Sequence, residues 1–357
     1  MHPQWPAVHL LHCLLAITGS LVAIAQPAAG FVLVLLTAFS LFGDLTGRVY
    51  LLRLLFFRRA SQNVVSPPLR PEPAPRLILC AGYDAAPTGA VYGRRWVAGY
   101  ERLGHLLHLR TSPAAVVFWS VALLLPPLGL RLAGIDAEWV SILQLPQTLL
   151  LLIAAFALGE IALSPPTPGA NGNASGVAAA LLAASALQKE PPTTLKVHVL
   201  ACGAAESTRE GMRAFVRSHR KQLGRKETWF VDLDSAGSGD PRYVEREVPV
   251  LAQRLDRRLL GLCEALADGS PERMGLPLGP AGCASLAAEW GYPAAALTAR
   301  EGLAVLPPNH HTPADRPEGI SGDSIEAVAE LAVDLVRLLD RELTREAASG
   351  STEEPET

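Results

Sequence analysis

The sequence predicts an α/β domain combined with about four membrane-spanning helices. Four long apolar runs divide the chain, and 49% of its 357 residues are hydrophobic. Outside these runs, short apolar or β-branched segments alternate with segments of helical periodicity. This alternation is typical of a mixed, mostly parallel sheet flanked by helices. We therefore expect a soluble α/β domain attached to two membrane hairpins.

The first two apolar runs predict an N-terminal hairpin. Ala7 to Ala25 is about long enough to cross a bilayer, Gln26-Pro27 breaks the run, and Ala28 to Phe42 follows. A signal peptide is the competing interpretation, but its basic region is missing and a second apolar run follows at once. His9 and His12 lie one helical turn apart near the start. They are either polar residues near the interface or a proton or metal site.

The second hairpin is expected over Ala114 to Leu130 and Val140 to Leu158, with kinks or shortening at Pro126-Pro127 and Pro146. Four spans return both termini to one side of the membrane. Only Arg131 lies in the opposite loop. The arginines that flank the hairpins on the terminal side are Arg48, Arg53, Arg58, Arg59, Arg94, Arg95, Arg102 and Arg110. This asymmetry predicts a multi-pass protein of the cell membrane with a cytoplasmic soluble domain. The arginines either attract anionic lipid headgroups or act only as orientation signals.

The composition along the chain predicts the domain boundaries. They are residues 1–60 for the first hairpin and its arginine-rich flank, 61–75 for a proline-rich linker, 76–110 for the first part of the soluble domain, 111–160 for the inserted hairpin, 161–345 for the second part, and 346–357 for a disordered acidic tail. Net charge is −3 with mixed signs, so no nucleic-acid partner is expected. The cysteines are scattered without metal spacing, which fits a reducing compartment.

The soluble part carries a regular series of predicted elements. Strands are expected at Arg76–Ala81, Leu195–Ala201, Thr228–Leu233 and Ala294–Thr298, and helices at Gly176–Leu187, Arg209–Leu223 and Val248–Ala267. A last helix is expected to be capped by Asp323, with Glu326 three residues later.

Five short motifs follow one another along the soluble part, each at a strand end or a helix start, where α/β enzymes place their ligands. They are C-A-G-Y-D (80–84), G-A-N-G-N-A-S-G (169–176), G-A-A-E (203–206), V-D-L-D-S-A-G (231–237) and N-H-H-T-P-A-D (309–315). In this order they resemble the co-catalytic di-zinc aminopeptidase family of metallopeptidase clan MH, which includes glutamate carboxypeptidases and glutaminyl cyclases. E-G-M-R-A-F, T-W-F and G-Y-P resemble a membrane-bound bacterial branch. The resemblance implies a zinc-exopeptidase-like fold over Arg76 to Ile320, less the inserted hairpin.

Three motifs lack the residue that this resemblance calls for. Gly82 stands at a zinc-binding histidine, which leaves Asp84 with no imidazole to orient. Gly172 stands at the carboxylate that bridges both metals, between two asparagines whose neutral oxygens are poor replacements. Ala205 stands at the general base, and a missing base lowers the rate by about 10²–10⁴.

The resemblance assigns the remaining metal ligands to Glu206, Asp234 and His311. Glu206 and His311 would serve one zinc and Asp234 the other, so neither ion has the three protein ligands of catalytic zinc. If the three side chains repack onto one ion, at most one zinc binds. His310 is expected to point elsewhere on an extended segment, and Asp315 to support the loop.

Two functions are compatible with this set of missing and remaining site residues. One is a pseudo-peptidase with a binding or scaffold role, and the other is a membrane-anchored zinc aminopeptidase that uses a reduced site. The second hairpin enters between the first and second motifs, so the site is expected close to the membrane surface. Its partner would be a peptide or a membrane-proximal protein, besides the lipid bilayer itself. A third possibility, a structural or transport component, has no visible polar stripe in the spans to support it.

Overall fold

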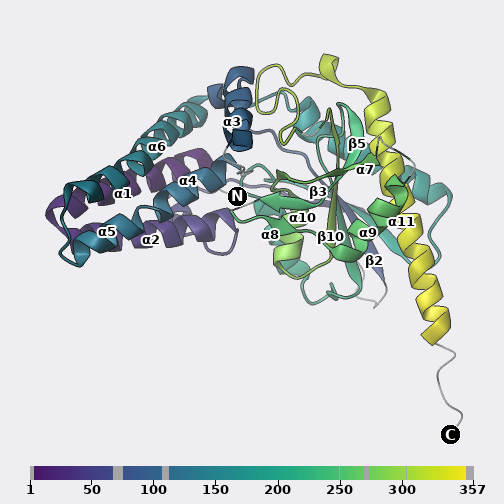
Figure 1. Ribbon diagram of the computed structural model, residues 1–357. Coiled ribbons are helices and arrows are strands. Elements are labelled where there is room, and N and C mark those ends of the chain that lie inside the picture. Colours follow the sequence, from purple (N-terminus) through teal and green to yellow (C-terminus); the bar gives the residue numbers. More distant parts are fainter. Residues whose placement is uncertain are drawn as a thin grey trace, which may run out of the picture. The chain divides into compact units, whose positions relative to one another are not determined.

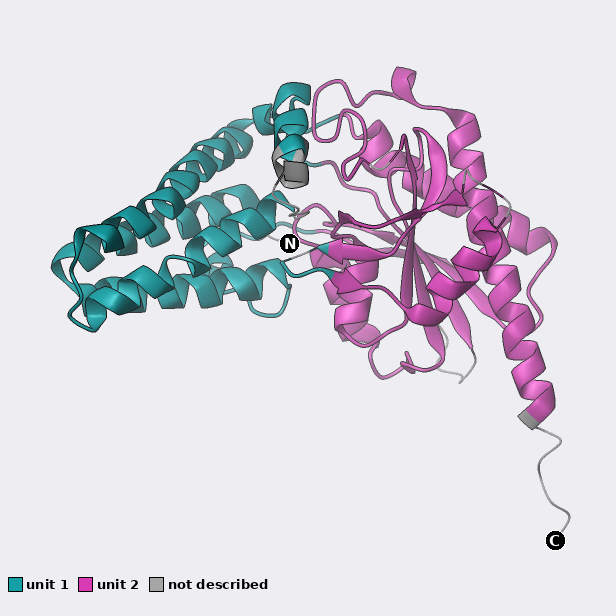
Figure 2. Ribbon diagram, in the orientation of Figure 1, with its two compact units in different colours: residues 1–60, 86–167, 248–252 teal, residues 61–85, 168–247, 253–357 magenta. Residues whose placement is uncertain are grey.

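The computed structural model describes residues 4–66, 75–106, 112–248, 250–268, 270, 273–302 and 304–350. The chain forms two compact units (Figure 2). Unit 1 comprises residues 1–60, 86–167 and 248–252, and unit 2 comprises residues 61–85, 168–247 and 253–357. Most of the predicted linker, residues 67–74, and the end of the predicted tail, residues 351–357, lie outside the described residues.

Unit 1 is helical (Figure 1). Its helices are α1 (Trp5–Ala25), α2 (Pro27–Leu45), η1 (Leu52–Leu55), η2 (Ala90–Tyr92), α3 (Arg94–Leu106), α4 (Pro113–Ala122), α5 (Leu125–Leu132) and α6 (Glu138–Leu163). Within the described residues, four stretches are long and apolar enough to cross a membrane: α1, α2, α4 with α5, and α6. The third is interrupted before Pro126-Pro127, as expected, whereas α6 continues through Pro146.

The interior of unit 1 contains more polar groups than the sequence indicated. The buried face of α1 carries His9, His12 and Ser20. His9 Nε2 lies 2.9 Å from Asp44 Oδ1, and His12 Nε2 lies 2.9 Å from Ser40 Oγ. The absence of a polar stripe in the spans was therefore a wrong prediction. These residues share one face of a helix, and only the packing against α2 and α6 shows that this face is buried.

Unit 2 is built on a mixed sheet of seven strands in the order β1-β3-β2-β4-β10-β5-β8. Their bounds are β1 Val64–Ser66, β2 Arg76–Gly82, β3 Lys196–Cys202, β4 Thr228–Leu233, β5 Asp240–Val244, β8 Gly275–Leu276 and β10 Ala294–Arg300. The central strands β3, β2, β4 and β10 are parallel, and β1 and β5 pair antiparallel to them. A small sheet contains β7 (Gln253–Arg254), β6 (Arg246–Val248) and β9 (Gly279–Pro280). The predicted mixed, mostly parallel sheet is confirmed.

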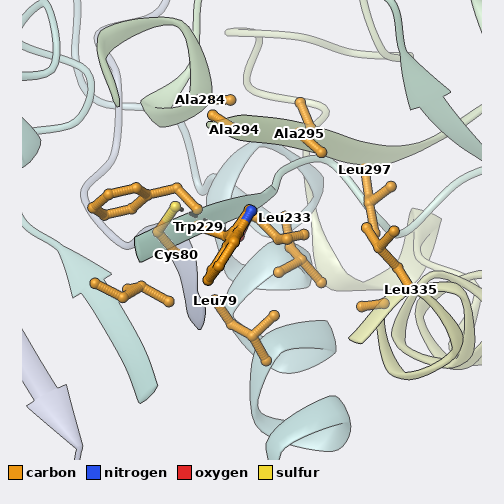
Figure 3. Close-up of a cluster of buried hydrophobic side chains, with 14 of the residues drawn as sticks. Leu79, Cys80, Trp229, Leu233, Ala284, Ala294, Ala295, Leu297 and Leu335 are labelled. Carbon is orange, nitrogen blue, oxygen red and sulfur yellow. Dashed lines mark hydrogen bonds between the residues drawn. The ribbon is translucent and has the colours of Figure 1, made fainter. Parts of the chain in front are cut away.

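Helices pack against this sheet to form the core of unit 2. They are α7 (Ser175–Lys189), α8 (Glu210–His219), α9 (Arg257–Ala267), α10 (Cys283–Glu289) and α11 (Gly322–Gly350). Strand and helix side chains, among them Leu79, Trp229, Leu297 and Leu335, meet in one buried cluster (Figure 3). This packing holds the carboxyl ends of the parallel strands at one edge, where the motifs lie.

Two helix predictions need correction. The helix expected over Val248–Ala267 begins only at Arg257, because residues before it form β6 and β7 and Asp256 caps the helix through the N–H of Leu259. The cap of α11 is Ser321, whose Oγ accepts the Ser324 N–H at 3.2 Å, rather than Asp323. This helix continues through Gly350, past residue 346, where the tail was expected to begin.

Candidate functional site

The loops that carry the motifs meet at the carboxyl edge of the sheet in unit 2. The first, third and fourth motifs follow β2, β3 and β4, which are neighbours in that sheet. The second forms a single π-helical turn, η3 (Ala170–Ala174), that leads into α7. Parallel strands direct their carboxyl ends to one side, so residues distant in the sequence converge here.

The third and fifth motifs meet directly. Oε2 of Glu206 lies 3.3 Å from Nε2 of His311. The other carboxylate oxygen of Glu206 accepts a hydrogen bond from Nδ2 of Asn173 at 2.9 Å. Burial on its own would raise the pKa of Glu206, but the His311 ring and the Asn173 amide more than offset it and hold the pKa below its usual value. Glu206 is therefore an ionised carboxylate between an imidazole and an amide.

Asp84 fastens the loop after β3. Its Oδ1 accepts the N–H of Ala205 at 2.7 Å, and its Oδ2 accepts the N–H of Glu206 at 3.2 Å. Asn173 Nδ2 also donates to the backbone carbonyl of Asp84. Burial and, second, the nearby charge of Glu206 raise the pKa of Asp84 to about 6. Asp84 therefore holds the backbone of the third motif in place.

The space around Gly82 is closed. A β-carbon built on this residue would lie 2.8 Å from the β-carbon of Ala205 and 2.9 Å from Oδ1 of Asn173. Both distances are shorter than ordinary van der Waals contact. A side chain at residue 82 therefore requires its neighbours to move.

Gly172 lies against an internal carboxylate. Asp315 accepts the N–H of Asn171 at 2.6 Å through Oδ1 and the N–H of Gly172 at 3.0 Å through Oδ2. A β-carbon on Gly172 would lie 3.1 Å from that second oxygen. Asp315 supports a loop, as expected, by joining the fifth motif to the second.

A comparison with protein families decides the affiliation. The model described as Peptidase family M28 matches residues 157–336, just over half of the chain. The chain belongs to peptidase family M28. The matched range contains the second to fifth motifs, and the first motif lies before it.

Solved structures similar to this M28 chain include aminopeptidases and glutaminyl cyclases. The aminopeptidase from Aneurinibacillus sp. strain AM-1 is 26% identical, with a TM-score of 0.38, over 48% of this chain and 39% of that protein. The zinc aminopeptidase BSAP from Bacillus subtilis is 22% identical, with a TM-score of 0.41, over 48% and 42%. The Tannerella forsythia glutaminyl cyclase is 14% identical, with a TM-score of 0.44, over 77% of each chain. The chain thus spans about two fifths of the length of these aminopeptidases. No curated protein sequence matches it.

The described residues of this M28 chain bring two predicted zinc ligands together, Glu206 and His311. In the described part of the chain, no group of three or more His, Cys, Asp or Glu side chains is arranged to hold a metal ion. Glu206 and His311 are in contact, but Asp234 does not complete a set of three with them. Structural and catalytic zinc sites use at least three protein ligands. Among the described residues, the predicted zinc therefore has two of its proposed ligands in contact, Glu206 and His311.

Asp234 lies near enough to Glu206 to feel its charge, but the two are not part of one metal-binding group among the described residues. Ser235 Oγ donates a hydrogen bond to Asp234 Oδ1 at 3.1 Å. Burial raises the pKa of Asp234 to about 7; the Arg300 guanidinium opposes this rise and the Glu206 charge adds to it. Asp234 therefore carries a proton for much of the time at neutral pH.

The histidine pair differs from the expectation. His310 does not point away from His311: the two rings stack with centroids 3.7 Å apart and planes 20° apart. The chain is not extended here, since φ is 58° at Asn309 and 51° at His311. Burial and the neighbouring His311 lower the pKa of His310 well below its usual value, so it is neutral.

Backbone strain is concentrated in the loops of the third, fourth and fifth motifs. Positive φ is unfavourable for residues other than glycine and persists only where the surroundings enforce it. The described non-glycine residues with positive φ all lie in or next to these motifs: Ala204, Thr208, Arg209, Ser235, Asn309 and His311. The surroundings therefore hold these loops in unfavourable backbone conformations.

Asn171 and Asn173 matter more than the sequence reasoning suggested. Asn173 donates to the Asp84 carbonyl and to Glu206 and so joins the first and third motifs, a role that the sequence reasoning did not include. Asn171 Oδ1 accepts the N–H of Gly237 at 2.8 Å and so joins the second and fourth motifs. The signal was visible as two amides beside Gly172, but their partners are far away in the sequence.

Proposed function

We propose that this M28 protein is a membrane pseudo-peptidase, whose unit 2 binds a peptide end without hydrolysing it. The observation that carries the proposal is the closed space at Gly82. The β-carbon of a histidine there would overlap Ala205 and Asn173, and the family's general-base position is itself Ala205. Residues 82 and 205 thus lack the family's zinc ligand and general base, and the side chains around residue 82 fill the space.

The site retains features of a binding surface. Its loops are strained and are fastened to one another by Asp84, Asn171, Asn173 and Asp315, which favours a preorganised arrangement. Glu206 is an ionised carboxylate, and Asp234 and Asp84 also become negatively charged when they lose their protons. Ionised carboxylates attract cations, and every peptide with a free amino end carries an ammonium group there, whatever its side chains. A free amino end is therefore the proposed ligand.

The membrane part of the proposal rests on unit 1. Four stretches are long and apolar enough to span a bilayer, and arginines are concentrated on the side of the chain termini. We infer a multi-pass protein of the cell membrane with unit 2 in the cytoplasm. Because the inserted residues 86–167 lie between the first and second motifs in the sequence, the ligand we favour is the exposed end of a membrane-proximal protein.

The proposal is tested with purified full-length protein and short peptides. We expect no zinc-dependent release of amino acids beyond that of Glu206→Gln. We also expect binding of a peptide with a free amino end that is stronger than binding of the same peptide acetylated. Zinc-dependent hydrolysis that Glu206→Gln abolishes would overturn the pseudo-peptidase assignment. Equal binding of both peptides would overturn the ligand assignment alone.

One observation favours a second candidate, a membrane-anchored zinc aminopeptidase with a reduced site. The 3.3 Å between Glu206 Oε2 and His311 Nε2 is close to the separation of about 3.3 Å that two ligands of one tetrahedral zinc have at bonds of about 2.0 Å. Metal analysis after gentle purification decides between the two. About one equivalent of zinc per chain favours the enzyme, and less than about a tenth argues against it.

A further inference from the structure

The segment after the second helix of unit 1 carries apolar side chains that its own unit leaves uncovered. Residues 46–60 follow α2 and contain the short helix η1. Five large apolar side chains are exposed between residues 49 and 57: Val49 39%, Leu51 44%, Leu54 65%, Leu55 73% and Phe57 52%. Scattered exposed apolar residues are ordinary, but such a gathering in one short segment marks an interaction surface.

We propose that residues 46–60 form an in-plane anchor that binds the anionic headgroup layer of the membrane leaflet next to the end of α2. The inference rests on the proposed membrane insertion of unit 1, and it is independent of the state of the peptidase-like site in unit 2. Amphipathic segments of this kind lie at the boundary between headgroups and acyl chains, with apolar groups inserted and basic groups among the phosphates.

A buried ionic cluster fixes the orientation of this segment. Arg53, within η1, donates from Nε to Asp44 Oδ2 at 2.6 Å and from Nη2 to Asp44 Oδ1 at 2.9 Å. Asp44 is also 2.9 Å from His9 Nε2, and both Arg53 and Asp44 are fully buried. Since the guanidinium points inward, the neighbouring Leu54 and Leu55 point outward. The exposed apolar surface is thus a consequence of how η1 is held.

The charges beside the segment fit anionic lipid. Arg48, Arg58 and Arg59 are exposed and flank the apolar residues. The Arg59 guanidinium lies 5.4 Å from the centre of the Phe57 ring, so the two groups share one surface. Each arginine near an anionic leaflet is attracted to it. Apolar side chains continuous with a membrane span, and bordered by arginines, favour a lipid surface over a protein groove.

A second segment of unit 1 has the same character. α3 precedes the second hairpin, so it lies on the same side of the membrane as residues 46–60 if all four stretches span. It begins with Arg94 and Arg95, and Trp96 beside them is 64% exposed. Tryptophan and arginine side chains are typical of the headgroup layer. Both connecting segments of unit 1 therefore present the groups that a lipid interface accepts.

The test places a nitroxide label in full-length protein and measures its collisions with oxygen and with a water-soluble nickel complex. Leu55→Cys reports on the segment, Phe156→Cys on α6 is the acyl-chain control with 88% exposure, and Lys189→Cys on α7 is the aqueous control. The protein is reconstituted into vesicles of phosphatidylcholine with one part in three phosphatidylglycerol, and into phosphatidylcholine alone. The same label is measured in an Arg58→Gln, Arg59→Gln background.

We expect Leu55→Cys to be shielded from nickel and accessible to oxygen, between the two controls. The shielding should decrease in pure phosphatidylcholine and in the arginine variant. A label as accessible to nickel as Lys189→Cys would overturn the anchor. A label inaccessible to both reagents would show that unit 2 or a second copy covers the segment, which also overturns it. If Phe156→Cys itself meets nickel freely, the membrane insertion on which the anchor depends has failed.

Discussion

Replacing Gly82 by alanine is expected to destabilise unit 2, because the added methyl group has no room. Its carbon would lie 2.8 Å from the β-carbon of Ala205 and 2.9 Å from Oδ1 of Asn173. Carbon atoms prefer about 3.5–4.0 Å, so the end of β2 and the loop at Ala205 must separate by roughly 0.7 Å or more. Overpacking of this kind costs about 1–3 kcal/mol.

Matched variants separate the clash from other effects of alanine. Ala205→Gly removes one of the two contacts, so the double variant Gly82→Ala with Ala205→Gly should recover part of the loss, with a coupling energy of about 0.5–2 kcal/mol. Gly172→Ala places its β-carbon 3.1 Å from Asp315 Oδ2 alone, the end of a side chain that can shift. Its effect should be smaller than that of Gly82→Ala.

The assay is denaturant unfolding of the full-length protein, followed by the fluorescence of Trp229 and Trp290, both in unit 2. The midpoint should fall in Gly82→Ala and rise again in the double variant. If Gly82→Ala is as stable as the natural protein, the space at residue 82 is open. The triple variant Gly82→His, Gly172→Asp and Ala205→Glu would then be expected to bind zinc, and the reasoning for a closed site would be refuted.

Three further predictions concern the residues that hold the loops together. Asn173→Ala removes the hydrogen-bond donor to Glu206 and to the Asp84 carbonyl, so it should lower the free energy of unfolding by about 1–3 kcal/mol. An unchanged denaturation midpoint would mean that water replaces the amide. Asp315→Ala leaves the N–H groups of Asn171 and Gly172 without their carboxylate and should lower the free energy of unfolding by a similar amount. Asp315→Asn should lower it less, and equal losses of stability in the two variants would contradict this. The pKa of Asp234 is raised to about 7, so the folded state holds a proton that the unfolded state has released, and stability should fall as pH rises from about 4 to about 7 and then level off. Asp234→Asn should reduce this slope in midpoints measured against pH, and an unchanged slope would show that Asp234 does not titrate there.

Local patterns in the sequence were enough to predict much of the fold. Thr228–Leu233 forms β4 with both predicted ends, because a short, mostly apolar run is recognisable as a buried strand from neighbouring residues alone. The four long apolar stretches of unit 1 were predicted from the length of their apolar runs, which depends on neighbouring residues only. The motifs identified the family because their residues are close together in the sequence. The family match shows the coarser part of that prediction, membership of peptidase family M28.

Long-range contacts decided the rest. The helix at Arg257 begins late because the residues before it pair with other strands, and the polar face of α1 is known only from its packing against α2 and α6. The sequence by itself placed Gly82, Gly172 and Ala205 at positions where the resemblance implies a histidine, a carboxylate and a general base. Only the tertiary structure showed that Asn173 and Ala205 close the space at Gly82. Composition and periodicity are local properties, whereas the closure of a site depends on distances between segments that meet only after folding.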